Sequence, residues 1–340
     1  MNWCSESSLD QVHLSSEPIY LIVQIAQILQ TIACPLLLWL MSRRYGRVYL
    51  NANLKCLLNF HKTTAILYCL SFSIIQTYHV ISRLFLKECD LLVPDRVCIW
   101  FRIVQSWATN VFQMFYIAVS LEVLLGIAAK KLYNSIWTAR SLGILTYILS
   151  FCAVFPSLAI DLKSTNFLAN CASFENKGKL HLKTIFMWFI SLDVLSLISM
   201  ICLKLYIECV LANKRFQYDV NRKVERKELR RCFNLMLPNI ILHTACYLYF
   251  SISWMLIFDQ FEQLQNPQFR SLISNIIPFY VFCTPIIWCI VLHYQKKKFD
   301  VLQTDRERDV YFCELNRQWG PQQTAEPTRC FRKHRVTIIT

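Results

Sequence analysis

Polar side chains recur at four-residue spacing inside one long apolar stretch of this chain. Gln105, Thr109 and Gln113 lie within the stretch 98–128. Four residues is close to one helical turn, so a helix would place the three side chains on one face. Polar groups inside a membrane are costly, and they usually face the interior of a helix bundle. Such a face can bind a small molecule by hydrogen bonds, or it can join neighbouring helices with no ligand present.

Similar polar side chains occur in three other apolar stretches. Asp193 lies in the fifth stretch and Tyr280 in the seventh. Tyr247, Ser251 and Trp254 form a stripe at helical spacing on the sixth. We expect these five side chains, together with the three above, to line a ligand pocket with apolar walls. Hydrogen bonding between helices is the alternative for each residue taken singly.

Long helices are needed to position these side chains, and the sequence has seven apolar stretches of suitable length. A helix needs about 20 apolar residues to cross the bilayer core. The predicted spans are 18–41, 56–82, 98–128, 141–160, 184–210, 233–258 and 272–294. We therefore predict an all-α membrane protein, with an extracellular N-terminus (1–17), a seven-transmembrane helix bundle (18–294) and a cytoplasmic tail (295–340).

Lys and Arg are concentrated in alternate connecting segments, after the first, third, fifth and seventh spans. Because positive residues favour the cytoplasmic side, we expect the N-terminus outside and the C-terminus inside. The segment after the fourth span is also basic and is the exception. We predict a basic helix over 213–232 that extends the sixth span. We predict that residues 296–302 form a short amphipathic helix on the membrane surface; a solvated tail is the alternative.

The composition favours a membrane protein over other classes. Charged residues make up 17% of the chain, below the roughly 25% of a typical soluble domain. The net charge of +14 lies mostly beside apolar stretches, so we expect contact with lipid head groups and not with nucleic acid. No P-loop, Gly-x-Ser-x-Gly turn or His-Glu-x-x-His helix occurs, so we expect neither an enzyme nor a cofactor or metal. His61 and His243 lie in spans and are interpreted as hydrogen-bonded packing residues.

Four of the 16 cysteines lie in the segments predicted to be extracellular, where disulfides form. Cys4, Cys89, Cys98 and Cys171 permit three pairings. We favour a bond between Cys98 and Cys171, which would tie the loop after the fourth span to the start of the third. Some of these thiols remaining free is the alternative.

Two motifs resemble those of G-protein-coupled receptors. Glu122 lies at the inner end of the third span, where rhodopsin-like receptors carry an acidic residue followed by arginine. Here Val123 follows instead, so ordinary coupling would have to use other basic residues. The seventh span reads Thr-Pro-Ile-Ile-Trp over 284–288, where those receptors carry Asn-Pro-x-x-Tyr. The proline matches, and its polar and aromatic flanks are altered.

A closer resemblance is to the nematode serpentine chemoreceptors of the alpha and alpha/beta classes. It is carried by the cysteines before the third span, the run 115–122, the segment 128–133 and a proline-containing seventh span that ends in three lysines. This resemblance implies a receptor in the cell membrane, in the cilia of sensory neurons. It would bind an odorant or pheromone and signal to a heterotrimeric G protein.

The candidate contacts with a G protein lie at the inner ends of the third and sixth spans. They are Glu122, Lys130, Lys131, Arg226, Arg230 and Arg231. The alternative function is a transporter or ligand-gated channel without G-protein coupling. Arg102, Asp193 and Lys204 would then be candidate path residues. No internal repeat supports that alternative.

Overall fold

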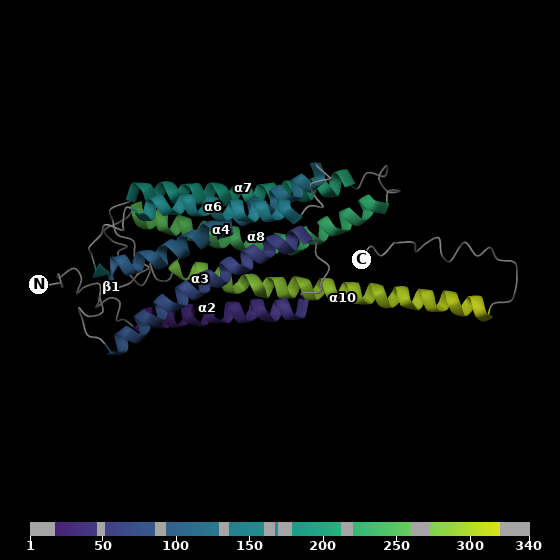
Figure 1. The fold of residues 1–340 in the computed structure, drawn as a ribbon, viewed down its shortest axis with the longest axis horizontal. Helices are drawn as coiled ribbons and strands as arrows, with labels where there is room; N and C mark the ends of the chain where they lie inside the picture. The colour runs from purple at the N-terminus through teal and green to yellow at the C-terminus, as the bar shows by residue number, and fades with distance from the viewer. Residues whose placement is uncertain are drawn as a thin grey trace, which may run out of the picture. The chain divides into compact units, whose positions relative to one another are not determined.

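The computed structural model describes residues 18–45, 52–85, 93–128, 136–159, 167–168, 179–211, 220–259 and 273–319. Within these residues, seven helices are long and apolar enough to cross a membrane (Figure 1). The helices are α2 (Pro18–Tyr45), α3 (Ala52–Phe85), α4 (Asp95–Ala128), α6 (Ile136–Ala159), α7 (Lys179–Leu211), α8 (Val220–Asp259) and α10 (Ile276–Trp319). The predicted seven-transmembrane helix bundle is confirmed, and each predicted span lies mostly within one helix.

The helices expose apolar side chains and bury polar ones, as α2 illustrates. Ile22 and Leu29 are 65% and 63% exposed, whereas Gln24 and Gln27 are at most 1% exposed. A helix on the surface of a soluble protein has the opposite arrangement. An exposed apolar face of this extent fits contact with lipid. Inside, the Gln24 side-chain amide donates to Gln76 Oε1 at 3.0 Å, the kind of hydrogen bond that joins membrane helices.

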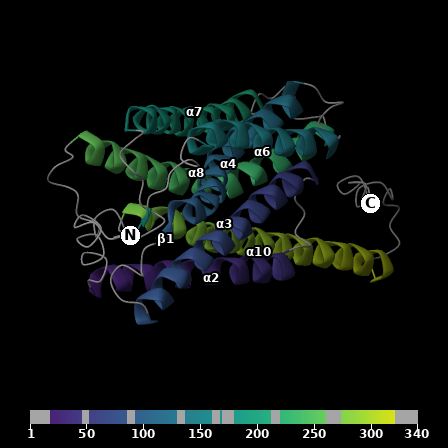
Figure 2. The same ribbon diagram turned by 60° about the vertical axis from the view of Figure 1, so that its left-hand side comes forward.

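The centre of the bundle is α4. In the apolar 18-residue stretch of its candidate span 72% of the residues are buried, compared with 28–50% in the corresponding stretches of the other six. It packs against α3, α6, α7 and α8, and it lies between α7 and α3 in both views (Figure 1 and Figure 2). The polar face predicted on this helix is therefore placed where residues from several helices can reach it.

A short strand pair stands at the end of the bundle where α4 begins. β1 (Val93–Pro94) pairs antiparallel with β2 (Phe167–Leu168), with Val93 opposite Leu168. The pair brings the segment after α6 back to the start of α4. Cys98, in the first turn of α4, is disulfide-bonded. Cys171 lies outside the described residues, so its pairing with Cys98 stays a prediction. We call this end of the bundle the β1 end.

Two helices extend beyond the apolar stretches that predicted them. α8 begins at Val220, so the basic segment before the sixth span is helical over its later part, as predicted. α10 continues to Trp319, well past the short helix expected at 296–302. Many residues in this extension are strong helix formers, and Gly320 and Pro321, which disfavour helix, follow it. The apolar periodicity fades there, which is why it did not predict this extension.

The sequence has prolines at 156, 238, 278 and 285, within the predicted spans, and each is expected to interrupt the helical hydrogen bonds of its span. The structure corrects this expectation in part. Pro238 lies inside α8 and Pro285 inside α10, where each removes a backbone hydrogen bond. Pro278, by contrast, lies in the first turn of α10, where the backbone N–H has no helical partner in any case. Pro156 lies in the last turn of α6. Pro35, inside α2, is a helix-interior proline that the prediction omitted.

One close contact holds α3 against α6. A Cβ atom on Gly143 would lie 2.5 Å from the ring of Phe60, so a side chain there would force the helices apart. One turn along, the Tyr147 hydroxyl donates to the Phe60 carbonyl at 2.8 Å and lies 2.9 Å from Thr64 Oγ1. Small residues and interhelical hydrogen bonds of this kind hold membrane helices together. The contact fixes the helices that flank α4.

The contacts of the chain divide it into two compact units, Met1–Cys289 and Ile290–Thr340. All residues of the candidate site belong to the first unit.

Candidate ligand site

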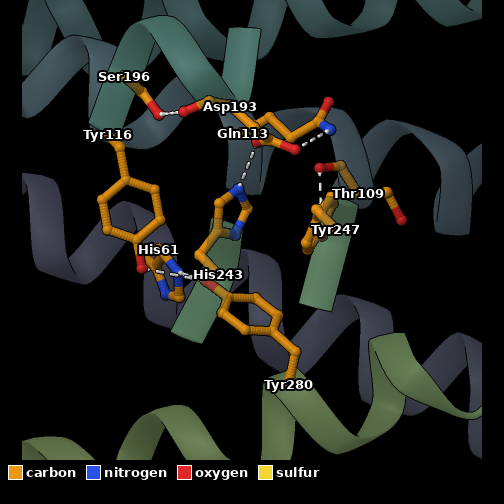
Figure 3. Close-up of polar contacts among 9 residues, drawn as sticks. All are labelled: His61, Thr109, Gln113, Tyr116, Asp193, Ser196, His243, Tyr247 and Tyr280. Carbon is orange, nitrogen blue, oxygen red and sulfur yellow. Dashed lines mark hydrogen bonds and ion pairs between the residues drawn. The ribbon is translucent and has the colours of Figure 1, made fainter. Parts of the chain in front are cut away.

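Asp193 on α7 is the centre of a buried polar group. Its Oδ1 accepts a hydrogen bond from His243 Nε2 on α8 at 3.0 Å. Its Oδ2 accepts one from Gln113 Nε2 on α4 at 3.5 Å (Figure 3). All three side chains are at most 1% exposed. A carboxylate buried this deeply needs such partners because its charge is otherwise very costly. The link therefore ties α7 to both α4 and α8.

A second hydrogen-bonded group joins α3, α4 and α10. The hydroxyl oxygens of Tyr116 and Tyr280 are 3.2 Å apart, and His61 Nε2 lies 3.4 Å from the Tyr280 hydroxyl (Figure 3). The His61 ring also packs against aromatic rings, with centroid distances of 4.6 Å to Phe115 and 5.1 Å to Trp288. The two hydroxyl groups and His61 Nε2 thus hydrogen-bond to one another inside an aromatic environment, while His61 Nδ1 has no partner among the described residues.

The His243 ring connects the two groups. Its centroid lies 4.8 Å from that of Tyr116, 4.1 Å from that of Tyr247 and 5.0 Å from that of Tyr280. Polar and aromatic contacts from α4, α7 and α10 therefore meet around one imidazole of α8. We call this set the polar core; it consists of His61, Gln113, Tyr116, Asp193, His243, Tyr247 and Tyr280.

Four of the eight predicted ligand-binding residues belong to the polar core: Gln113, Asp193, Tyr247 and Tyr280. Thr109 contacts it through its backbone, since its carbonyl accepts a hydrogen bond from the Tyr247 hydroxyl at 3.4 Å. The Thr109 hydroxyl itself donates to the carbonyl of Gln105 at 2.8 Å. Thr109 and Gln105 are both only partly buried. Their spacing on α4 thus places them on the face that the sequence predicted.

The remaining two predicted residues lie nearer the β1 end of α8. Trp254 stacks with Phe186 of α7, with centroids 6.4 Å apart and planes 4° from parallel. It is part of an apolar cluster formed by Phe186, Phe189, Trp254 and Ile273. Ser251 is fully buried, and its hydroxyl has no hydrogen-bond partner among the described residues. The eight residues therefore form two neighbouring groups, one in or beside the polar core and one nearer the β1 end of α8, and not one ring around a single point.

Sequence reasoning missed three members of the polar core. His61 and His243 do form hydrogen bonds, as expected, but neither was predicted as part of a site. Asp193 was correctly identified as a buried acid, yet its partner lies 50 positions away on another helix. A search for partners at helical spacing within one span cannot find such a pair. Tyr116 follows Gln113 by three residues on the same helix face, and this spacing was an available signal.

The described residues contain no cluster of three or more His, Cys, Asp or Glu side chains that could hold a metal ion.

At the opposite end of the bundle, Glu122 is buried with 4% of its surface exposed. It forms a side-chain hydrogen bond with Asn53 of α3, and the adjoining Val123 is also buried. Arg230 is exposed near the start of α8. Arg226 and Arg231 lie in α8, but their side chains are outside the description. Lys130 and Lys131 lie outside the described residues altogether.

The profile of a protein family, the serpentine-type seven-transmembrane G-protein-coupled receptor class ab chemoreceptors, matches residues 7–320. This chain belongs to that family. The class ab chemoreceptors are a family of receptors. The matched region includes every residue of the polar core. No curated protein sequence matches the chain significantly.

Proposed function

We propose that this class ab chemoreceptor binds a small odorant or pheromone and signals to a heterotrimeric G protein. The observation that carries the proposal is the polar core, to which α3, α4, α7, α8 and α10 each contribute a buried polar side chain. A ligand shifts a conformational equilibrium only if it binds the two states differently. A molecule that binds beside the polar core would act on the five helices that meet there, and it could therefore change how they pack.

We propose that α8 transmits the conformational change from the polar core to the cytoplasmic side. This helix carries His243 and Tyr247, and it runs as one element back to Val220. Pro238 lies between the polar core and the basic segment, and proline permits a helix to bend. A change in the contacts of His243 would thereby move the basic end of α8.

The proposed G-protein contacts are the basic residues at the inner ends of α4 and α8. Lys130, Lys131, Arg226 and Arg231 join the exposed Arg230 in this proposal. Glu122 is held inside the bundle by Asn53. We therefore assign it a role in helix packing while the inner end of the bundle is closed, and a contact with the G protein only after that end opens. This arrangement supplies positive charge although Val123 occupies the position at which arginine was expected.

The proposed location is the cell membrane, with the N-terminus outside and the C-terminus inside. The alternate distribution of Lys and Arg supports this orientation. The resemblance to nematode receptors of the alpha and alpha/beta classes supports placement in the cilia of sensory neurons. The β1 end would then face the outside, and the polar core would be reached from that end.

The function can be tested by expressing the receptor with a promiscuous Gα subunit and recording calcium across a panel of volatiles and pheromones. At least one compound should evoke a signal that the Asp193→Asn variant reduces at equal surface expression. Silence across the panel from well-expressed receptor would count against the proposal. A ligand-evoked current in liposomes that contain no G protein would favour a channel instead.

A further inference from the structure

The chemical class of the ligand can be approached through Asp193, the acid at the centre of the bundle. A carboxylate in such a position is the group that would bind an ammonium ligand. Here both of its oxygens already accept hydrogen bonds from the protein, from His243 at 3.0 Å and from Gln113 at 3.5 Å. The imidazole occupies the place that a ligand's ammonium group would need. Glu122, the other buried carboxylate among the described residues, is held by Asn53 near the other end of α4.

An uncharged hydrogen-bonding group lies nearer the β1 end of the same helix face. His243, Tyr247 and Ser251 follow one another at four-residue spacing on α8, so their side chains share a face. Ser251 is fully buried, and its hydroxyl lacks a partner among the residues described. A buried hydroxyl without a partner is destabilising, and a ligand that pairs with it would remove that penalty. A hydroxyl can either donate or accept.

Gln105 and Ser251 each lie one turn towards the β1 end from the two residues that join α4 to α8, Thr109 and Tyr247. Successive membrane spans run in opposite directions, so the third and sixth spans, α4 and α8, are antiparallel. The hydrogen bond between the Tyr247 hydroxyl and the Thr109 carbonyl sets their register. One turn further towards the β1 end, α4 presents Gln105 and α8 presents Ser251. An amide and a hydroxyl, both uncharged, are thus two of the polar groups on this side of the polar core. The buried cation Arg102, about one turn further along α4, already has an interaction partner within the protein.

The neighbouring surfaces are aromatic. Phe186 on α7 lies 5.8 Å from Phe250 and 6.4 Å from Trp254 between ring centroids. Phe189 and Ile273 complete the apolar cluster. Aromatic faces favour flat or branched apolar molecules. The surroundings of Ser251 therefore combine an apolar wall with one or two neutral hydrogen-bonding groups.

We infer that the ligand is an uncharged molecule with an aromatic or branched apolar body and one hydroxyl or carbonyl group. It contacts Gln105, Ser251 and the cluster around Phe186 and Trp254, on the β1 side of the Asp193–His243 pair. This inference rests on the proposed function, because it specifies the ligand class of the same receptor.

A matched pair of probes tests the inference: phenethyl alcohol and phenethylamine, which share one aromatic body and differ in a hydroxyl or an ammonium group. Thermal unfolding of the full-length receptor in lipid nanodiscs is followed at rising concentrations of each probe. The alcohol should stabilise the wild type, and the amine should not. Ser251→Ala should weaken the apparent affinity for the alcohol by about two- to tenfold, the loss of one hydrogen bond.

Ser191→Ala is the control. Ser191 is exposed on α7, and its hydroxyl donates to the Met187 carbonyl of its own helix, so the alcohol should bind this variant as it binds the wild type. His243→Phe removes the imidazole from Asp193 and should let the amine bind. Where that variant is too unstable to purify, the wild type and Ser251→Ala still decide the inference.

Three results would overturn the inference. The amine could stabilise the wild type as strongly as the alcohol does, or the alcohol could stabilise Ser251→Ala with the same apparent affinity as the wild type. The third is that neither probe changes thermal unfolding. Failure of the proposed function has a different signature. Receptor that binds the alcohol but never alters nucleotide exchange on any supplied G protein would contradict G-protein signalling, while its probe binding would still support the ligand class.

Discussion

The Asp193–His243 pair should be strongly coupled in stability. Both side chains are 0% exposed and their polar atoms are 3.0 Å apart. His243→Phe leaves the carboxylate with only the 3.5 Å hydrogen bond from Gln113. Asp193→Leu leaves His243 Nε2 without its acceptor, while His243 Nδ1 already has no partner among the described residues. Each single variant therefore strands a buried polar group.

The expected loss in the free energy of unfolding depends on whether the pair behaves like a hydrogen bond between membrane helices or like a buried charged pair in a soluble protein. Hydrogen bonds between membrane helices have a mean strength of only about 0.6 kcal/mol, because partners are also found in the unfolded state within the membrane. Breaking a buried charged pair in a soluble protein costs roughly 3–5 kcal/mol. Since His243→Phe removes the shorter of the two hydrogen bonds to a fully buried acid, we expect the free energy of unfolding to fall by roughly 3 kcal/mol. Asp193→Leu should lose less, because the group that it strands is an imidazole.

The double variant should be more stable than either single variant, because apolar replacement of both partners of a buried pair is often nearly neutral. The assay is denaturant-induced unfolding of purified receptor in mixed micelles, arranged as a double-mutant cycle. Thr244→Val is a matched control, because Thr244 is buried on the same helix and its hydroxyl has no partner within the described part of the chain. Additive losses, with the double variant the least stable, would refute this account of the pair.

Three further predictions concern contacts outside the polar core. Gly143→Ala should lower the free energy of unfolding by about 1–3 kcal/mol through overpacking against Phe60, and Phe60→Leu should restore part of the loss; an unchanged stability would contradict the close contact. Tyr147→Phe should lose about 1–3 kcal/mol, since it removes two hydrogen bonds to α3, and unfolding in the same micelles measures it. Cys98→Ser should lower stability by roughly 2–5 kcal/mol and reduce surface expression. Cys171→Ser should match it, and unequal effects that add in the double variant would show that the two cysteines are not partners.

The positions of the helices could be predicted from sequence because the bilayer imposes a minimum length and an apolar composition. Seven stretches met that condition, and all seven are helices in the structure. The ends of the helices were less well predicted, because the requirement for apolar residues applies only within the membrane. The extension of α10 to Trp319 depends on helix propensity and on the stop at Gly320 and Pro321, which hydropathy does not register.

The candidate site was predictable only one helix at a time. Gln113, Asp193, Tyr247 and Tyr280 were chosen because each is a polar group in an apolar span, and the structure brings all four into the polar core. Their pairing depends on how the helices pack, which spacing along one helix does not contain. For this reason the partner of Asp193 was missed.

The receptor interpretation depends on a bundle whose two ends lie on opposite sides of the membrane. The most direct measurement labels epitope tags at Met1 and Thr340 with antibodies in intact and in permeabilised cells. We predict that the tag at Met1 is labelled in intact cells and that the tag at Thr340 is labelled only after permeabilisation. Labelling of both tags in intact cells, or of both tags only after permeabilisation, would contradict the account.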